Sequence, residues 1–189
     1  MKASLHIAQD PAADEVLSTD AFALLVGMLL DQQFPMERAF AGPAKILERF
    51  GTLDPATIAQ ADPDEFATLC ATPPAIHRYG RSMAGRVQDV AKAVVKDYDG
   101  DAEELWTGAT SGADLLARIR RLPGFGEQKA KIFTALVAKQ LGVRPDGWEQ
   151  AAGAYAEPGS HRSVADVVDQ DSLDQVRAFK KEQKAATAR

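Results

Sequence analysis

Cysteine is nearly absent from this chain of 189 residues, in which Cys70 is the only example. A single thiol excludes a disulfide framework and a four-thiolate cluster built by this chain alone, and it is typical of a reducing compartment. We expect Cys70 to be buried and unreactive. The histidines, His6, His77 and His161, lie in separate segments without the spacing of zinc ligands, so we expect no metal site and assign them surface or capping roles.

Long hydrophobic runs are also missing. The longest, AFALLVGMLL at residues 21–30, is shorter than the roughly 20 residues that cross a bilayer. The amino-terminal stretch MKASLHIAQDPAADE lacks the apolar segment of a signal peptide. Apolar residues nevertheless make up 46% of the chain, enough for one sizeable domain or two small lobes with a shared core. We therefore expect a folded cytoplasmic protein without a membrane segment.

Positive charge is outnumbered, since the formal net charge is −5. An acidic body repels a polyanionic partner at long range, but the cations are concentrated in two zones. The first zone, residues 117–131, sets the acid Glu127 against Arg118, Arg120, Arg121, Lys129 and Lys131. The second, residues 176–189, sets Glu182 against Arg177, Lys180, Lys181, Lys184 and Arg189. Together they are compatible with one cationic face for nucleic acid. The alternative for each zone is a solvated helix surface, and the second zone favours this alternative more strongly than the first.

Strand signals are scarce as well, because no run of β-branched residues alternates at period two, whereas apolar spacings of three and four recur throughout. The sequence therefore predicts an all-α protein of about ten helices. Thr19 or Asp20 is expected to cap a helix that ends at residue 30, and Gly51 to stop another. The remaining helices are expected at 35–50 with a disturbance at 42–43, after 54, after 62, and at 81–99, 113–121, 127–141, 147–155 and 172–184.

The stretch LPGFG, residues 122–126, is a predicted hairpin between two of these helices. Pro123 prevents continuation of the first helix, and the glycines adopt backbone angles that other residues resist. Glycines also leave the amide groups open at the start of the next helix, where the helix dipole attracts an anion. Lys129 and Lys131 stand in its first turns, within reach of a phosphate. The alternative is a glycine C-cap followed by an ordinary helix.

Three segments together resemble a known family. LPGFGEQKA at 122–130, MLLDQQ at 28–33 and YGRSMAGRVQDVAKAVVKDYDG at 79–100 are similar to segments of the helix-hairpin-helix (HhH-GPD) DNA glycosylases, which include endonuclease III and the alkyl-base glycosylases. The resemblance covers roughly residues 20–150. It implies a two-lobed helical bundle, with residues 21–140 forming the lobe that holds the hairpin. Residues 1–20 and 141–189 would form the second lobe and complete the cleft.

The resemblance also implies roles for residues in the hairpin and after it. In this family the hairpin grips a DNA phosphate, a role that would fall to Leu122, Gly124, Gly126, Lys129 and Lys131. An aspartate further along serves catalysis, and Asp146 lies 18 residues after Gln128, the interval that the family uses. A carboxylate there would stabilise the positive charge that develops on the sugar and orient or deprotonate a water molecule. The alternative is an N-cap aspartate without chemistry.

Two further positions concern the flipped nucleotide and the type of reaction. Gln33, or its neighbour Gln32, would enter the duplex by resemblance to the family's glutamine. The family's bifunctional members carry a lysine where this chain has Gln128, while Lys129 stands one residue later and is turned by about 100° around the helix. A Schiff-base step is therefore not expected. Gln128 would read the base or cap a neighbour, and Trp148 would line the pocket or anchor the loop.

The resemblance implies a monofunctional DNA glycosylase of base excision repair, a hydrolase that releases a damaged or mispaired base from double-stranded DNA. We expect a monomer that uses no cofactor, and no iron–sulfur cluster because the cysteines are missing. The alternative is a non-catalytic helix-hairpin-helix DNA-binding protein, which the acidic net charge, Asp31 and Gln128 favour. A third interpretation is a hairpin used for protein contacts.

Overall fold

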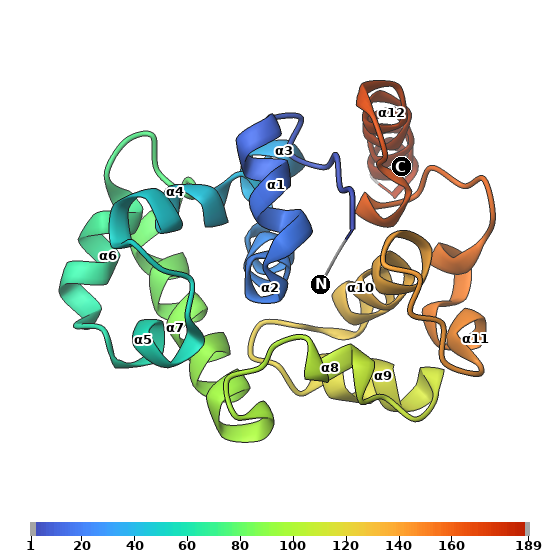
Figure 1. Ribbon diagram of the computed structural model, residues 1–189. Coiled ribbons are helices and arrows are strands. Elements are labelled where there is room, and N and C mark those ends of the chain that lie inside the picture. The colour runs from blue at the N-terminus through green and yellow to red at the C-terminus, as the bar shows by residue number, and fades with distance from the viewer. Residues whose placement is uncertain (1–2, 188–189) are drawn as a thin grey trace.

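The structure, a computed structural model, describes residues 3–187, and within that range every regular element is a helix (Figure 1). The all-α prediction is therefore confirmed. The helices are α1 (Pro11–Thr19), α2 (Ala21–Leu30), α3 (Met36–Phe40), α4 (Gly42–Phe50), α5 (Pro55–Gln60), α6 (Pro63–Ala71), α7 (Gly80–Tyr98), α8 (Glu104–Thr107), α9 (Gly112–Arg120), α10 (Glu127–Gln140), α11 (Trp148–Ala152) and α12 (Gln170–Thr187), with 3₁₀ turns η1 (Gly153–Ala156) and η2 (Val164–Asp166).

Aspartate side chains begin several of these helices. Asp20 accepts a hydrogen bond from the Ala23 amide at 2.8 Å, and Asp54 accepts one from the Thr57 amide at 2.7 Å. Asp62 does the same for the first turn of α6. Each bond satisfies an amide that has no partner within its helix. These caps confirm the predicted starts, and Gly51, with φ of 86°, ends α4 as expected.

The structure departs from the predicted elements in several places. The helix predicted at 35–50 is two helices, because the chain breaks at Ala41 between α3 and α4. Helix α1, capped by Asp10, and the short α8 were not predicted. Helix α12 begins at Gln170 and continues through Thr187, beyond the predicted end at 184. Short helices escape pattern reading because one or two turns offer too few apolar positions to show a period.

Helix α2 lies at the centre of the molecule, and all its residues from Phe22 to Leu30 are buried. Helices α1, α3, α4 and α7 pack against it, while α5 and α6 pack on α7 (Figure 1). On the other side, α9, α11 and both 3₁₀ turns surround α10. Cys70 and Trp106 are buried in the core, and burial raises the pKa of the Cys70 thiol to about 12. The division into lobes at residues 20 and 140 stays a prediction.

Candidate nucleic-acid interface

The hairpin, residues 122–126, is held by two backbone hydrogen bonds between residues three apart, and it packs on the last turn of α2. The Leu122 amide donates to Ile119 O and the Phe125 amide to Leu122 O, both at 3.1 Å. Gly124 has φ of 82°, and a Cβ added to it would lie 2.7 Å from Leu29 Cδ1. Only glycine fits both that angle and that approach. The Leu122 side chain is buried, so its part in the hairpin is to hold the turn in the core.

The start of α10 is open to solvent. Gly126, its N-cap, is exposed, and no side chain among the described residues caps this end. The first amides of a helix have no partner within the helix, and the dipole adds positive potential there. Lys131, one turn further, forms an ion pair with Glu127 at 2.8 Å. The arrangement of amides can bind an anion such as a DNA phosphate.

Lys129 turns inward instead of toward solvent. Its Nζ donates to Leu29 O at 2.9 Å and lies 5.8 Å from the centroid of the Phe125 ring. Burial lowers the pKa of the Lys129 ammonium to about 8, opposed by the nearby charge of Asp31 and assisted by that of Arg86. The lysine predicted to meet a phosphate therefore joins the hairpin's helix to the end of α2.

Asp31 stands at that end of α2, as its C-cap residue. Its side chain is only 11% exposed, and Lys180 of α12 approaches Oδ2 to 3.8 Å. Burial raises the pKa of the Asp31 carboxyl; the charges of Lys180 and Lys129 oppose this shift, and that of Glu37 adds to it. Asp31 is not among the site residues predicted from the sequence. The available signal was an acid that ends an apolar helix, where the helix dipole disfavours negative charge.

The loop between α2 and α3 is held on its buried side by His77 and is exposed at Gln33. The Tyr79 amide donates to His77 Nδ1 at 3.1 Å, so the neutral ring carries its proton on Nε2 and donates it to Gln32 O at 3.0 Å. His77 is 2% exposed, so the expected surface role is wrong and the histidine supports the loop from inside. Gln32 Nε2 lies 3.5 Å from Met83 Sδ. Gln33 is exposed and has φ of 51°, a left-handed angle that is uncommon for residues other than glycine.

Asp146 lies elsewhere. It is exposed, and its carbonyl accepts a hydrogen bond from the Gly112 amide at 2.8 Å. Gly112 begins α9, whose nine residues span about 13 Å, and the hairpin follows the other end of that helix. A groove of about 440 Å³ runs beside α9, and its lining includes both Asp146 and Arg120. The structure thus gives Asp146 a groove but does not bring it together with Lys129 and the end of α2.

Two further candidates, Gln128 and Trp148, have other surroundings. Gln128 is exposed, and its Nε2 donates to the Tyr155 hydroxyl at 3.0 Å, which is the neighbour-capping alternative of the sequence analysis. Trp148 is half-buried and lines a separate cavity of about 640 Å³ between α10, η2 and the start of α12. Roles for both residues toward a flipped base stay predictions.

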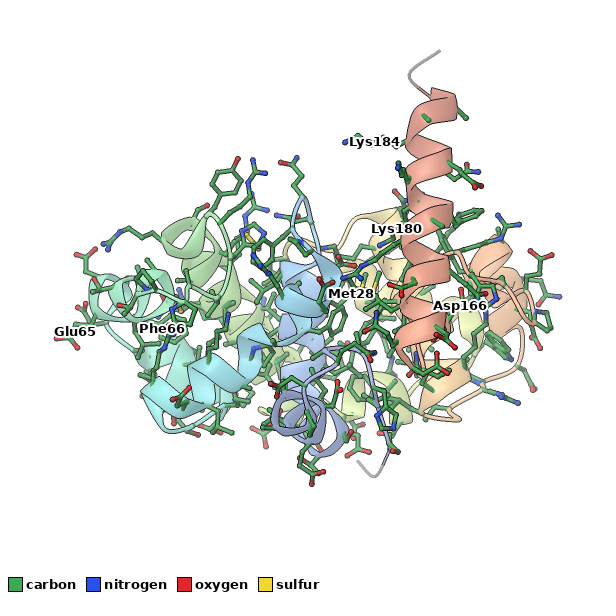
Figure 2. All side chains as sticks on the ribbon, turned by 90° about the horizontal axis from the view of Figure 1, so that it is seen from above. Met28, Glu65, Phe66, Asp166, Lys180 and Lys184 are labelled. Atoms are coloured by element: carbon green, nitrogen blue, oxygen red, sulfur yellow. The ribbon has the colours of Figure 1, made fainter. Side chains whose placement is uncertain are left out.

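Some cations of the two basic zones form ion pairs within the protein. In the first, Arg118 pairs with Asp114 at 3.0 Å, while Arg120 and Arg121 are exposed. In the second, Arg177 pairs with Glu37 at 2.5 Å. Figure 2 shows Lys180 and Lys184 on the side of α12 that faces α2, and both are exposed. Arg189 lies outside the described residues.

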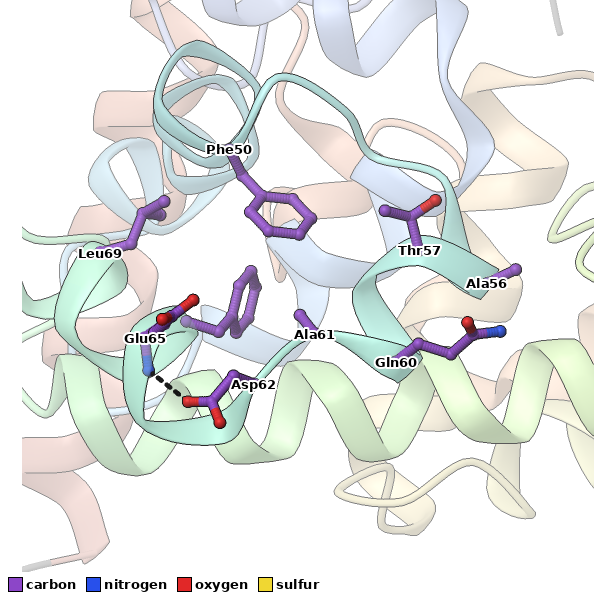
Figure 3. Close-up of a pocket in the computed structure, with 9 residues that line it drawn as sticks. Phe50, Ala56, Thr57, Gln60, Ala61, Asp62, Glu65 and Leu69 are labelled. Carbon is purple, nitrogen blue, oxygen red and sulfur yellow. Dashed lines mark hydrogen bonds between the residues drawn. The ribbon is translucent and has the colours of Figure 1, made fainter.

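A cavity of about 490 Å³ between α4, α5 and α6 is a poor candidate for the nucleic acid (Figure 3). The rings of Phe50 and Phe66 form an edge-to-face pair in its wall, with centroids 5.3 Å apart. Asp62 and Glu65 also line it, and Asp62 is occupied in capping α6. Two carboxylates without a cation in the lining repel phosphate, so this cavity does not extend the hairpin surface.

Comparison with protein families matches residues 26–189 to HhH-GPD, described as the HhH-GPD superfamily base excision DNA repair protein. The chain belongs to this family. No curated protein and no solved structure matches the chain. Within residues 3–187, no helix is long and apolar enough to cross a bilayer, and no three His, Cys, Asp or Glu side chains are grouped as metal ligands would be.

Proposed function

We propose that this protein is a monofunctional DNA glycosylase that hydrolyses the N-glycosidic bond of a damaged or mispaired base. One observation carries the proposal: the hairpin and the first turn of α10 contact Leu29 in the last turn of α2, and Asp31, with its carboxylate, is the C-cap residue at that same end of α2. The first binds a DNA phosphate, and the second supplies negative charge where the sugar becomes positive. Family membership supports a role in base excision repair. The proposed location is the cytoplasm, at the nucleoid in a bacterium.

The duplex would be opened at the loop between α2 and α3. Extruding a nucleotide costs a few kcal/mol of stacking and pairing, which an inserted side chain offsets by filling the space. Gln33 is the candidate because it is exposed at the tip in a strained backbone conformation, a feature that clusters at functional sites. The hairpin, through Gly124, Gly126 and the first turn of α10, would hold the strand beside it. The protein would act as a monomer and without a cofactor.

Two carboxylates are candidates for the chemical step. Asp146 has the spacing from the hairpin that the family uses, and Asp31 has the position beside it. Either would stabilise an oxocarbenium-like sugar and accept a proton from the attacking water. Asp146→Asn and Asp31→Asn, assayed in parallel for base release, distinguish them.

A lyase step is not part of the proposal. The Lys129 amine is held by Leu29 O and stands one position after that of the family's nucleophilic lysine. Borohydride treatment of the protein with its substrate duplex is therefore expected to trap no covalent adduct. An adduct that disappears in Lys129→Gln would make the protein bifunctional.

The defining experiment is a product screen. Duplexes that carry uracil, alkylated, oxidised or mismatched bases are incubated with the protein and scored for abasic sites by alkaline cleavage. We expect release from at least one of them. Binding without product from any duplex would favour the non-catalytic DNA-binding protein instead, which the acidic net charge favours. Duplex affinity that does not change with salt would favour a protein partner, because phosphate binding releases counterions and weakens as salt rises.

A further inference from the structure

We propose that Asp31, and not Asp146, is the carboxylate that faces the sugar, and that Lys129 and Lys180 are positioning residues that hold it in place. This inference rests on the proposed glycosylase function and names the residue that carries its chemical step. It departs from the position that the hairpin spacing predicts, 115 residues further along the chain. Contacts, energetics and charge each support it.

The contacts connect Asp31 to the hairpin in two steps. Gly124 approaches Leu29 so closely that an added Cβ would lie 2.7 Å from Cδ1. Lys129, from the helix that the hairpin starts, bonds to Leu29 O at 2.9 Å. Asp31 follows two residues later, and Gln33 two residues after that. A strand held at the start of α10 and opened by Gln33 would therefore pass beside Asp31, whereas Asp146 lies beyond the far end of α9.

The stability of the fold does not explain an acid at this position. Asp31 ends an apolar helix, where the dipole is negative and the last carbonyls favour a cation. Its side chain is only 11% exposed, and removing a carboxylate from water costs more free energy than an ion pair commonly returns. An uncharged side chain would suit this position better. Groups that cost stability are typical of functional sites.

Two cations oppose the effect of burial on Asp31 and favour its ionised form. Lys180 of α12 approaches it to 3.8 Å, and Lys129 of α10 contributes a second cation. Glu37 of α3 is the opposing acid, and it is itself bound to Arg177 at 2.5 Å. Lys180 is 44% exposed and lies 3.8 Å from Oδ2 of Asp31, so it can stay beside the carboxylate while a sugar approaches. Asp146 has no comparable pair of cations in its groove, where Arg120 is the one cation among the described lining residues.

The reaction balances without a further reagent. The bond between C1′ and the base nitrogen breaks, and its electron pair leaves with the base. Water adds to C1′ and gives one proton to Asp31, and one proton returns to the departing base. The products are an abasic sugar and the free base. Asp31 ends the cycle ionised, as it began, and its negative charge lowers the energy of the positive sugar between these steps.

The test uses duplexes that need no knowledge of the base. One carries a pyrrolidine abasic analogue, whose ring nitrogen is protonated like the sugar cation, and the other carries the neutral tetrahydrofuran analogue. We expect the wild-type protein to bind the pyrrolidine duplex on the order of 10²-fold more tightly, because transition-state mimics gain the charge interaction that catalysis uses. Asp31→Asn should lose this preference while its affinity for the tetrahydrofuran duplex stays within about threefold, because phosphate contacts dominate that affinity.

Controls separate this inference from the proposed function. Asp89→Asn, at an exposed acid of α7, should keep the preference, and circular dichroism melting of each variant checks that it is folded. An unchanged preference in Asp31→Asn, loss of preference in Asp146→Asn alone, or no preference in the wild type would each overturn the inference. Failure of the proposed function has a different signature, which is the absence of abasic product from every duplex in the screen.

Discussion

The two candidate acids, Asp31 after α2 and Asp146 before α11, lie in different regions of the molecule and differ in almost every physical respect. Near the hairpin, which follows one end of α9, the Asp31 side chain is 11% exposed and lies beside lysines of α10 and α12. At the other end, Asp146 is exposed on a loop that is held by the Gly112 amide. Only the second has the expected spacing along the chain. The difference teaches that an interval in sequence does not by itself give a position in space, because the path of the intervening loop also decides where the side chain lies.

The largest expected effect is on base release. Asp31→Asn should slow release on the order of 10²-fold, as the loss of a stabilising electrostatic group typically does, and Asp146→Asn should change it by less than about threefold. Single-turnover rates on whichever duplex the screen identifies provide the measurement. If the two variants exchange these values, the comparison reverses and the spacing prediction for Asp146 is correct.

The next effect concerns two glycines, Gly124 in the hairpin and Gly147 beside Asp146. Gly124→Ala and Gly147→Ala both place a side chain at a left-handed φ, of 82° and 79°, and each should lower the free energy of unfolding by about 1–3 kcal/mol. Only at Gly124 does the new Cβ also meet Leu29, at 2.7 Å. At Gly147 it meets the flexible end of Gln150, at 3.3 Å.

Gly124→Ala should therefore weaken duplex binding by about tenfold, while Gly147→Ala should leave binding near the wild-type value, because only the first displaces the amides at the start of α10. Urea denaturation and duplex titration provide the two measurements. Equal loss of binding in both variants would show that the hairpin has no special part in holding the strand.

A third effect is a shift in pH dependence. Below the pKa of Asp31 the carboxyl is neutral and cannot stabilise the sugar cation, so release should fall on the acid side. Lys180 lowers that pKa more than any other charge, Lys129 also lowers it, and Glu37 raises it. Lys180→Gln should therefore move the acid limb of the rate profile to higher pH.

A second titrating group lies nearby and must be distinguished. Burial lowers the pKa of His77, and Lys129, Arg78 and Arg86 contribute in the same direction, but Lys180 is not among its neighbours. Movement of the acid limb in Lys180→Gln therefore identifies Asp31 and not His77. Lys96→Gln, at an exposed cation in the last turn of α7, is the matched control. A limb that stays in place in Lys180→Gln contradicts the assignment.

The smallest effect concerns α12. Lys184 is exposed on the side of the helix that faces α2, one turn beyond Lys180 (Figure 2). If it contacts a phosphate, Lys184→Ala should reduce the slope of log affinity against log salt by about one unit. The same substitution at Lys96 should leave the slope unchanged. Equal slopes for Lys184→Ala and the wild type would mean that this end of α12 is a solvated surface.

Helix caps and the hairpin could be predicted from the sequence because their causes are local. Asp20, Asp54 and Asp62 each bond to an amide two or three residues later, so the pattern and its consequence lie within one window. The turn at 122–126 is likewise decided by its own proline and glycines. The break at Ala41 was visible as a disturbance at Gly42 and Pro43, although its result, two helices, was not.

The burial of Asp31 and the inward turn of Lys129 could not be predicted in this way. Both depend on Leu29, whose carbonyl meets a lysine 100 residues further along the chain. His77 was assigned to the surface or to a cap for the same reason, since its partner is the Gln32 carbonyl on a different element. Asp146 was chosen from spacing, which carries no information about the path of residues 141–147.

By itself, therefore, the sequence determined an all-α chain of the HhH-GPD family, the helix starts at Asp20, Asp54 and Asp62, and a hairpin that can bind an anion. Hydrogen bonds between near neighbours and the conformational limits of proline and glycine are sufficient for that. The tertiary structure alone decided which acid lies beside the hairpin, because packing of the hairpin on Leu29 brings α2, α10 and α12 together. Burial and charge at that junction arise from contacts between distant segments, and no local pattern encodes them.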